Sequence, residues 1–317
     1  MRDFLDQKHI QYKLSVPIGQ LTGMNQKGIL PIVVYPVSVD NLRLLMKEIY
    51  RRNISYDVLG GLSNTYLCES YHKDIVVITT KVRDMVYKDN TLCIGCGYSL
   101  TKLSKELSEK GISGYEGFIG IPGSVGAAAI NNSGAFNSSM SKVVLGVNII
   151  NAKGKEEYLN NEDLQYSLRN SLLKRNLDRG VVLSIDLDIS HKVDTAVLHN
   201  RIKEFSNYRK KNIDGNRKSL GSVFVSSTLC NLYCHHRVAI FFKRLFYQPL
   251  KFIFHNKRLN TYMDFLFLGK PQLAKHCDSL NRFCWDKNTT EKDFMYYINV
   301  MQKLAHGKLR LEIDIRK

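Results

Sequence analysis

Apolar and polar positions follow two different periods along the first two thirds of the chain. Strand-length apolar runs occupy residues 30–37, 54–60, 74–80, 90–97 and 142–151, and residues 181–189 alternate strictly. Helical spacing occurs at 41–52, 99–110 and 194–212. Ser38 or Asp40 can cap the first helix, and Gly111 can end the second. The opening strand, helix and strand lead into a glycine turn at 60–61, an order that is common in nucleotide-binding proteins.

The last third of the chain differs in composition and in its pattern of apolar and polar positions. Residues 237–258 are aromatic and basic, residues 289–307 have the pattern of an amphipathic helix, and residues 308–317 alternate like a strand. The charged helix 194–212 therefore predicts a domain boundary. We interpret 237–258 as a helical cap packed on the last domain. Weak contact with an acidic membrane surface and docking of a partner enzyme are the alternatives.

Residues 117–136, "GFIGIPGSVGAAAINNSGAF", are almost free of bulky side chains. A flexible linker would explain the glycines but would be mostly polar. Apolar residues such as Phe118, Ile121 and Val125 are interleaved with the small ones. The pattern therefore indicates an ordered wall against which a large, flat group can lie, since small residues permit close backbone approach.

Composition and charge narrow the function classes. The 46 basic and 29 acidic residues give a net charge of +17, which favours an anionic partner. The chain has no recognition signature for nucleic acid, so we expect none to bind. It has no apolar segment of secretory or membrane-spanning length. We expect a cytoplasmic protein that is a monomer.

The seven cysteines are odd in number and scattered, as in a reduced cytoplasmic protein. Cys93 and Cys96 form a C-x-x-C within a strand pattern, which favours ordinary packing over a redox pair. No compact zinc spacing is present, and we expect no metal site. The residues that could be imagined as ligands do not have such a spacing: Cys230, Cys234, His235, His236, His276 and Cys277.

The small-residue stretch carries a motif that resembles a known family. "GIPGSVGAAAINNSGAF" is similar to the flavin-contacting motif of UDP-N-acetylenolpyruvoylglucosamine reductases, G-I-P-G-[ST]-V-G-G-A followed by N-x-G-A-[YF]. Ala127 stands where that family usually has glycine. "LGGLSN" at 59–64 resembles the family's L-G-x-G-S-N, with Leu62 in place of the third glycine. The resemblance runs from about residue 20 to the last strand and is interrupted at 229–268.

The resemblance implies an α+β fold. A two-subdomain FAD-binding module of the PCMH type, residues 1–84 and 85–192, would precede a smaller α+β substrate-binding domain, 193–317, with an atypical insert at 229–268. It also implies FAD as cofactor and NADPH as hydride donor. The implied FAD-contacting residues are Gly60, Gly61, Ser63, Asn64, Glu116, Gly120, Ile121, Pro122, Gly123, Ser124, Gly126, Ala127, Asn131 and Gly134.

Three shorter motifs imply the catalytic residues. "LRNSLLK" resembles Y-R-x-S-x-x-K and carries Arg169; "SLGSVFVSS" resembles A-G-S-F-F-K-N-P and carries Ser222; "GKLRLEIDIRK" resembles G-V-x-L-E-x-E-V and carries Glu312. Arg169 would hold the substrate carboxylate, Glu312 would share a proton with the enolate, and Ser222 would protonate the enol carbon. Tyr166 and Lys218 are implied to bind substrate. Leu168 occupies the family's tyrosine position, and Tyr166 lies two residues earlier.

The implied function is flavin-dependent reduction of UDP-N-acetylglucosamine enolpyruvate to UDP-N-acetylmuramate in peptidoglycan precursor synthesis. One alternative is a flavoprotein acting on another nucleotide sugar in surface-polysaccharide synthesis. Others are a non-catalytic flavin-binding protein and a basic surface binder with a reused fold. The diphosphates of these ligands give the basic charge a use. Arg209, Lys210, Lys211, Arg217 and Lys218 can reach such groups, or can form a solvated helix face.

Overall fold

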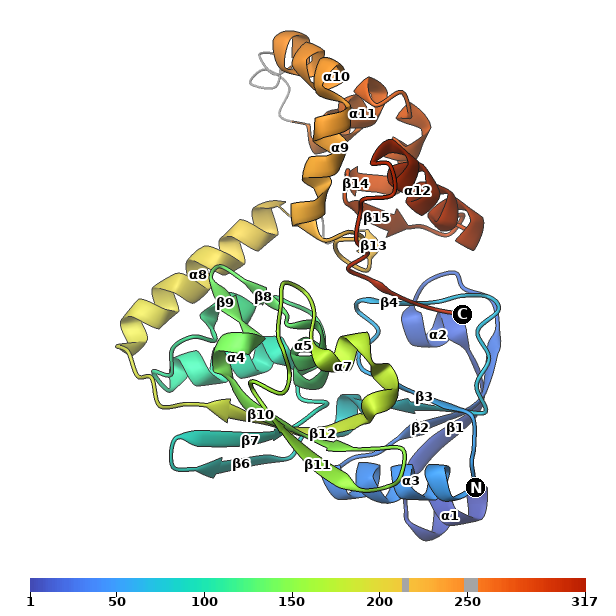
Figure 1. Ribbon diagram of the computed structural model, residues 1–317, viewed down its shortest axis with the longest axis vertical. Coiled ribbons are helices and arrows are strands. Elements are labelled where there is room, and N and C mark those ends of the chain that lie inside the picture. Colours follow the sequence, from blue (N-terminus) through green and yellow to red (C-terminus); the bar gives the residue numbers. More distant parts are fainter. Residues whose placement is uncertain (213–216, 248–255) are drawn as a thin grey trace. The chain divides into compact units, whose positions relative to one another are not determined.

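The computed structural model describes residues 1–212, 217–247 and 256–317 (Figure 1). Its contacts divide the chain into two compact units. The first unit comprises Met1–Val16, Ile29–Gly61 and His72–Ile213, and the second comprises Pro17–Gly28, Leu62–Tyr71 and Asp214–Lys317. Two N-terminal segments thus belong with the C-terminal third, and the helix expected at the boundary belongs with the first unit. Each unit is described by itself below.

The first sheet of the first unit has the strand order β1-β2-β5-β3. Its strands are β1 (Gln11–Pro17), β2 (Ile29–Tyr35), β5 (Ile75–Ile78) and β3 (Tyr56–Leu59). Both β2 and β3 pair in parallel with β5, which is buried along its whole length. Helix α3 (Val39–Arg51) lies between β2 and β3 in the chain, with Ser38 accepting a hydrogen bond from the Asn41 amide as its N-cap. The predicted β-α-β opening is confirmed.

The second sheet of the first unit is antiparallel throughout, in the order β11-β10-β12-β7-β6. The strands are β6 (Met85–Lys88), β7 (Thr91–Gly95), β10 (Val144–Ile150), β11 (Glu156–Asn160) and β12 (Val181–Asp188). The first sheet thus lies entirely before residue 84 and the second entirely after it. Both sheets contribute to one apolar cluster, in which Val77, Ile94 and Ile185 are buried.

Besides α3, the first unit has six helices among the described residues, of which only α4 and α8 have ten residues or more. They are α1 (Arg2–Gln7), α4 (Leu100–Glu109), α5 (Val125–Asn131), α6 (Met140–Val143), α7 (Leu172–Arg175) and α8 (Thr195–Asn212), with the two-residue strands β8 (Gly134–Ala135) and β9 (Ser138–Ser139) between α5 and α6. Helix α8 contacts α4 and the 3-10 turn η2 (Glu116–Phe118). This packing places α8 beside the small-residue stretch.

The second unit has a three-stranded antiparallel sheet, β13-β15-β14, and a parallel pair, β16-β4. Its elements are α2 (Ile18–Thr22), β4 (Thr65–Leu67), β13 (Lys218–Ser219), η4 (Ser226–Leu229), α9 (Cys230–His235), α10 (Arg237–Phe242), η5 (Lys243–Tyr247), α11 (Lys257–Phe267), η7 (Pro271–His276), β14 (Cys277–Ser279), β15 (Arg282–Trp285), α12 (Glu291–Leu304) and β16 (Asp314–Arg316). The strand predicted at 308–317 is therefore confirmed only at its end. Residues 213–216 and the part of the insert at 248–255 lie outside the described residues.

Aromatic side chains fill the core of the second unit. The Phe283 ring lies 4.8 Å from that of Trp285 and 5.0 Å from that of Phe294, and Tyr66 of β4 stacks on Trp285 at 5.8 Å. Tyr66 is fully buried. The segment Leu62–Tyr71 thus belongs to this unit because β4 supplies part of its core.

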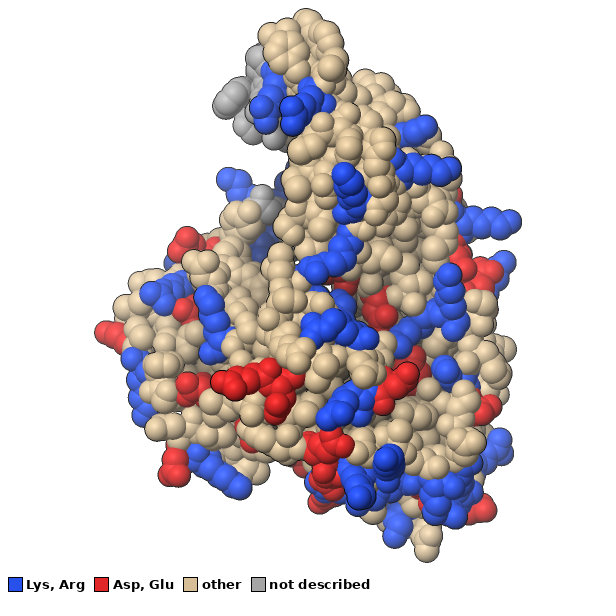
Figure 2. Space-filling view, viewed as in Figure 1, with Lys and Arg blue, Asp and Glu red and all other residues tan. Residues whose placement is uncertain are grey.

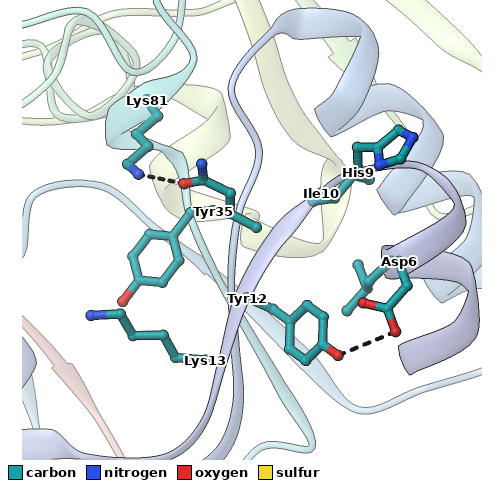
Figure 3. A pocket seen from close by; sticks show the side chains of 9 residues that line it. Asp6, His9, Ile10, Tyr12, Lys13, Tyr35 and Lys81 are labelled. Atoms are coloured by element: carbon teal, nitrogen blue, oxygen red, sulfur yellow. Dashed lines mark hydrogen bonds between the residues drawn. The ribbon is translucent and has the colours of Figure 1, made fainter.

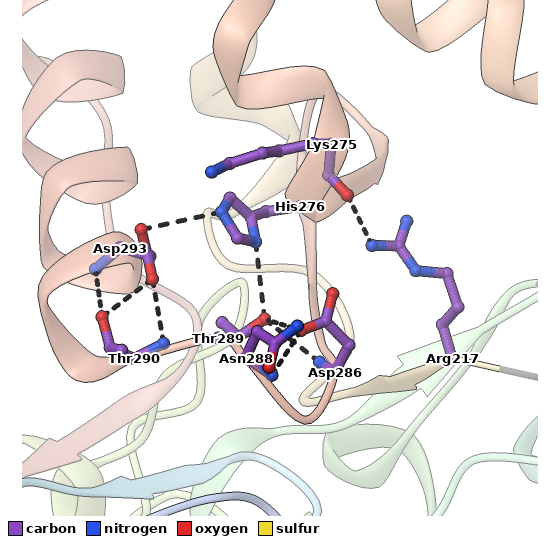
Figure 4. A network of polar contacts seen from close by, with 8 residues as sticks. All are labelled: Arg217, Lys275, His276, Asp286, Asn288, Thr289, Thr290 and Asp293. Atoms are coloured by element: carbon purple, nitrogen blue, oxygen red, sulfur yellow. Dashed lines mark hydrogen bonds and ion pairs between the residues drawn. The ribbon is translucent and has the colours of Figure 1, made fainter.

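Polar contacts tie the start of α12 to the η7–β14 segment (Figure 4). Thr290 and Asp293 form a capping box, and Asp293 Oδ1 lies 3.7 Å from Nε2 of buried His276. Burial lowers the pKa of His276 despite the attraction of Asp293. Arg217 donates from Nη2 to the Lys275 carbonyl at 2.7 Å. The bond from Arg217 joins residues 58 positions apart, so these contacts link distant segments of the second unit.

The surroundings of the cysteines favour ordinary packing over redox chemistry. All seven are free, and burial raises the pKa of Cys96 to about 12 and raises that of Cys93. A high pKa opposes thiolate formation, which supports packing over a redox pair. Within the described residues no cluster of three or more potential metal ligands occurs. Among those same residues, no helix has both the length and the apolar character needed to cross a membrane.

Candidate active site

The glycine turn after β3 lies against the start of helix α5. A Cβ built on Gly60 would be 3.0 Å from Ser124 Oγ and 3.6 Å from the Ala127 methyl carbon. Ser124 is the N-cap of α5 and accepts a hydrogen bond from the Ala127 amide. Residues 60–61 and 123–127 are separated by about sixty positions in the sequence yet form one local surface. Two of the motifs found in the sequence therefore converge in the first unit.

Different physical reasons explain why glycine occupies these motif positions. A Cβ on Gly126 would lie 2.7 Å from Cys96 Cβ, and one on Gly134 would lie 2.2 Å from the Ser138 carbonyl oxygen. Packing of the protein on itself excludes any larger residue at both. Gly120 and Gly123 have φ angles of +69° and +122°, which favour glycine for conformational reasons. These four glycines are explained by the fold alone.

Gly61 differs from the others. A Cβ built on it would meet nothing closer than 3.9 Å, and its φ is not positive. Neither packing nor backbone conformation in the described residues requires glycine there. The remaining physical reason for a bare backbone at this turn is close approach of a bound group.

The other motif residues hold the segment in shape. The Ile121 carbonyl accepts a hydrogen bond from Thr101 Oγ1 at 2.8 Å, and Asn131 Nδ2 donates to the Ala127 carbonyl at 2.9 Å. Pro122 is exposed, while Ser124 and Gly126 are buried. The small-residue stretch is therefore ordered and partly buried, as predicted, rather than a flexible linker.

Glu116 is buried and both of its carboxylate oxygens have protein partners. Oε2 accepts from the Gly114 amide at 2.7 Å, and Oε1 pairs with Arg201 Nη1 of α8 at 2.8 Å. The contact that the structure gives this residue is thus the attachment of α8 to the small-residue stretch. Its contact with FAD stays a prediction.

Arg169 lies in a tight turn over the end of the same stretch. Ser167 and Asn170 exchange backbone hydrogen bonds of 3.0 and 3.1 Å, and Arg169 between them has a φ of +53°. Its Nη2 donates to the Gly134 carbonyl at 2.7 Å, and Nη1 lies 3.4 Å from the Asn132 carbonyl. A non-glycine residue in the left-handed region costs about 1–2 kcal/mol, and such strain is found at functional sites.

The turn is anchored by the residues that flank Arg169. Fully buried Ser171 donates from Oγ to the Ile130 carbonyl at 2.6 Å and caps α7. Asn132 Nδ2 donates to the Ser167 carbonyl at 2.9 Å. The motif that carries Arg169 is therefore held directly on residues 130–134 of the flavin-type motif.

Arg209 of α8 is a second cation at this place. Its guanidinium carbon lies 5.4 Å from the centre of the Phe136 ring, and a Cβ on Gly120 would lie 2.9 Å from its Cδ. Arg209 Nε is buried and makes no hydrogen bond within the described residues. Burial, and then the neighbouring charge of Arg169, lower the pKa of Arg209. The sequence grouped Arg209 with four other basic residues, and only the structure distinguishes it.

Tyr166 and Leu168 occupy different environments. Tyr166 packs against the core of the first unit, its hydroxyl is buried without a hydrogen-bond partner among the described residues, and burial raises its pKa. The Leu168 side chain is 57% exposed at the tip of the turn. The predicted substrate contact of Tyr166 stays a prediction.

In the second unit, the motifs of Ser222 and Glu312 pair with each other. Phe224 and Leu311 form an antiparallel bridge, the Glu312 amide donates to the Val223 carbonyl at 2.9 Å, and the Val225 amide donates to the Arg310 carbonyl at 2.8 Å. Buried Asn281 holds the other side: its Oδ1 accepts a hydrogen bond from the Phe224 amide, and its Nδ2 donates one to the Phe224 carbonyl. Glu312 thus lies opposite Val223, next to Ser222, and both candidates are half-buried.

Asn64 joins the same strand pair. Its Nδ2 donates to the Glu312 carbonyl at 3.0 Å, and its own carbonyl accepts from the Asp314 amide at 2.9 Å. Leu62, two residues earlier, has a φ of +55°, a conformation that suits the glycine found there in the motif that 59–64 resembles. Ser63 is half-buried between them. Residues from three distant motifs therefore meet in the second unit.

The predicted site residues are divided between the units. Arg169 belongs to the first, while Ser222, Glu312 and Lys218 belong to the second. Lys218 is exposed on β13 opposite Trp285, with its ammonium group next to Gly23. A cavity of about 720 Å³ in the first unit, bordered by Asp6, Tyr12, Lys13, Tyr35 and Lys81, is lined by none of them (Figure 3).

The residues present fit a bound flavin dinucleotide. Gly61 is exposed, and neither packing nor backbone conformation explains why it lacks a side chain. A group that approaches the backbone closely would explain it. The two adjacent guanidinium groups of Arg169 and Arg209 are suited to an anion beside the same small-residue stretch. The glycine turn, the α5 segment and the two arginines are the residues that would border it.

Comparison with known proteins agrees with this arrangement. The model of a family described as "FAD binding domain" matches residues 30–159. The UDP-N-acetylenolpyruvoylglucosamine reductase of Bacillus subtilis (strain 168) is 31% identical over 209 residues, covering 66% of this chain and 68% of that protein. The enzyme of the same name from Bacillus pumilus (strain SAFR-032) is 29% identical over the same extent.

A solved structure extends the comparison to the whole chain. The UDP-N-acetylenolpyruvylglucosamine reductase from Thermus caldophilus matches with a TM-score of 0.65 at 19% identity, covering 97% of this chain and 99% of that one. At this identity the match is evidence for the fold, and it confirms the predicted α+β architecture with a PCMH-type FAD-binding module. Taken with the extent of identity to the Bacillus proteins, it means that this chain belongs to the UDP-N-acetylenolpyruvoylglucosamine reductase family.

Proposed function

We propose that the protein is an FAD-dependent oxidoreductase that reduces UDP-N-acetylglucosamine enolpyruvate to UDP-N-acetylmuramate with NADPH, a step of peptidoglycan precursor synthesis. The observation that carries the proposal is that Arg169, Ser222 and Glu312 each stand in the family's motif and are each held by residues of a second motif. We also propose that residues 1–84 and 85–192 are the FAD-binding subdomains, that 193–317 bind substrate, and that the protein is a cytoplasmic monomer.

Held by the glycine turn at 60–61 and the α5 segment, a bound FAD would supply the hydride chemistry that links NADPH to the methylene carbon of the enolpyruvyl ether. Negative charge then develops beside a carboxylate, so electrostatic stabilisation is the main requirement. Arg169 meets it, because a guanidinium stays charged and can grip a carboxylate with two parallel hydrogen bonds. Its anchoring on the Gly134 carbonyl fixes the direction of the fork before substrate arrives.

Arg209 adds a second positive charge on the same unit. Two like charges in a partly buried place are unfavourable to each other until an anion is bound between or beside them. The pair therefore favours ligands that carry carboxylate or phosphate. NADPH and a UDP-sugar both do, and exposed Lys218 in the second unit can serve their diphosphates.

Ser222 and Glu312 supply the proton chemistry. Ser222 is the candidate donor of the proton to the enol carbon, and Glu312 is the candidate for sharing a proton with the enolate oxygen. The segments that carry them pair with each other in one antiparallel backbone contact, which supports assigning both residues to one site. The pair is braced by Asn281 and Asn64, so its geometry does not depend on exposed loops.

An anaerobic titration tests the proposed function. Purified protein should carry flavin absorbance that is bleached by one equivalent of NADPH and restored by UDP-N-acetylglucosamine enolpyruvate. Bleaching without restoration would leave a flavoprotein but remove the proposed substrate. Absence of flavin after reconstitution with FAD would remove the proposal entirely.

One observation favours a second candidate substrate. Leu168 places an exposed apolar side chain where the family motif has tyrosine, and "VSS" at 225–227 replaces its K-N-P. Both changes lie in segments assigned to substrate contact. A related nucleotide sugar of surface-polysaccharide synthesis is therefore the alternative, and restoration of absorbance by that sugar in preference to the enolpyruvyl substrate would select it.

Two glycine substitutions separate cofactor contact from folding. Gly61→Val should change the thermal midpoint of the flavin-free protein little, because a Cβ there lies no closer than 3.9 Å to the surrounding protein atoms, but should lower FAD affinity at least about tenfold through clash with the bound group. Gly126→Ala should instead destabilise the flavin-free protein by about 1–3 kcal/mol through overpacking on Cys96. Thermal unfolding and flavin titration measure the two effects, and unaltered FAD affinity in Gly61→Val would contradict the cofactor contact.

A further inference from the structure

A continuous helical segment in the second unit turns its apolar side outward. Helix α10 continues directly into the π-helical turn η5, giving residues 237–247. Five of their apolar side chains are 44–70% exposed: Val238, Phe241, Phe242, Leu245 and Phe246. Their spacing of three, one, three and one places them on one stripe of the helix. The segment contacts α9 and α11, as a helical cap on the last domain would, and it leaves this stripe uncovered.

The other side of the segment is fixed to α11. Lys243 pairs with Asp264, and buried Tyr247 donates from its hydroxyl to Asn260 Oδ1 at 2.6 Å. Just before the segment, His236 Nε2 lies 3.0 Å from the Leu304 carbonyl oxygen. The orientation is therefore set by polar contacts, and these hold the apolar stripe away from the unit. The Phe242 and Phe246 rings stack at 5.9 Å with an interplanar angle of 7°, which keeps the stripe continuous.

The exposed charged residues on the segment and at the start of α11 are all cations, and the acidic Asp264 is paired with Lys243. Arg237 and Arg244 are exposed on the segment, and Lys257 and Arg258 are exposed at the start of α11. The sequence from 229 to 258 contains six Lys or Arg residues and no Asp or Glu. Figure 2 shows blue side chains beside the tan surface of α10 on the face in view. Exposed bulky apolar groups flanked only by cations are complementary to a surface that is apolar inside and anionic at its boundary.

We propose that this face, Val238, Phe241, Phe242, Leu245 and Phe246 with Arg237 and Arg244, binds the surface of an anionic lipid bilayer. The apolar side chains enter the boundary between headgroups and acyl chains, and the arginines lie at the lipid phosphates. A second copy of the chain is disfavoured as occupant, because self-association would bring two cationic faces together without acidic partners. The proposal is independent of the proposed reduction.

Vesicle co-sedimentation of the full chain tests the proposal. Wild-type protein should sediment with vesicles of equal parts phosphatidylcholine and phosphatidylglycerol, should sediment far less with phosphatidylcholine alone, and should be released by salt. The double variant Phe241→Ser, Phe246→Ser should bind at least about tenfold more weakly, because each phenylalanine contributes apolar area. Leu177→Ser, which alters an exposed apolar side chain of the first unit, should bind like wild type.

Charge reversal gives a second, independent test of binding to anionic vesicles. Arg237→Glu with Arg244→Glu should abolish the preference for phosphatidylglycerol, and circular dichroism and flavin content should show that every variant is folded. Three results would overturn the proposal: no sedimentation of wild type, equal sedimentation with both vesicle types, or undiminished binding of the double phenylalanine variant. A dimer in size-exclusion chromatography that the phenylalanine variant loses, without vesicle binding, would assign the face to a second copy instead.

Discussion

Replacement of Ser222 by alanine should slow the reoxidation of the NADPH-reduced protein by UDP-N-acetylglucosamine enolpyruvate by about two to four orders of magnitude. The reason is that the hydroxyl is the candidate donor of the proton that completes the reduction. Bleaching by NADPH precedes that proton transfer, so its rate should be nearly unchanged. Stopped-flow absorbance of the two half-reactions measures both rates on the same preparation.

The effect should be confined to this serine. The segment 223–225 is held by hydrogen bonds to the Arg310 and Glu312 backbone and to Asn281, and these bonds do not use the Ser222 hydroxyl. The substitution should therefore not unfold the unit. Ser226→Ala, an exposed serine four residues later, is the matched control and should behave like wild type. Equal reoxidation rates for Ser222→Ala and wild type would remove Ser222 as the proton donor.

Replacement of Arg169 by lysine should lower kcat for the overall reaction by about two to three orders of magnitude. Lysine keeps the positive charge but loses the planar fork that can hold a carboxylate and, at the same time, donate to the Gly134 carbonyl. Because the interaction strengthens as the enolate forms, the loss should appear mainly in kcat, with a smaller change in KM. Steady-state kinetics with varied enolpyruvyl substrate measures the two parameters.

The neighbouring Arg175 supplies the comparison for Arg169. It is an exposed residue of α7 that contacts Gln165, and Arg175→Lys should leave both parameters within about twofold of wild type. Arg169→Asn, which tolerates the positive φ of +53°, separates loss of the guanidinium from backbone strain. If Arg169→Lys and Arg169→Asn both retain wild-type kcat, the residue does not stabilise the developing charge.

The elements with strong local patterns agree between sequence and structure. The run at 30–37 became β2, the amphipathic positions of 41–52 became α3 with Ser38 as its cap, and the strict alternation at 181–189 became β12. In each, side chains within one short window decide which face is buried. The prediction failed where only part of the window is paired: the alternation at 308–317 yields a strand over Asp314–Arg316 and an isolated bridge at Leu311.

The candidate site shows a similar division. Motif resemblance named Arg169, Ser222 and Glu312, but could not say that Arg169 rests on residues 132 and 134 or that Glu312 lies opposite Val223. Arg209 carried no motif of its own and was grouped with four other basic residues. Its nearness to Arg169 and Gly120 depends on the packing of α8 against η2, which joins segments about ninety residues apart.

The amino-acid order by itself determined the family, the strands and helices with clear periodicity, and the chemistry of the three catalytic candidates, because each depends on residues close together in the chain. The tertiary structure decided which glycines packing and backbone conformation require and which they do not, that β4 pairs with β16, and that the stripe from Val238 to Phe246 faces outward. These depend on contacts between distant segments. A helical stripe has the same spacing whether it is buried or exposed, and only its neighbours determine which.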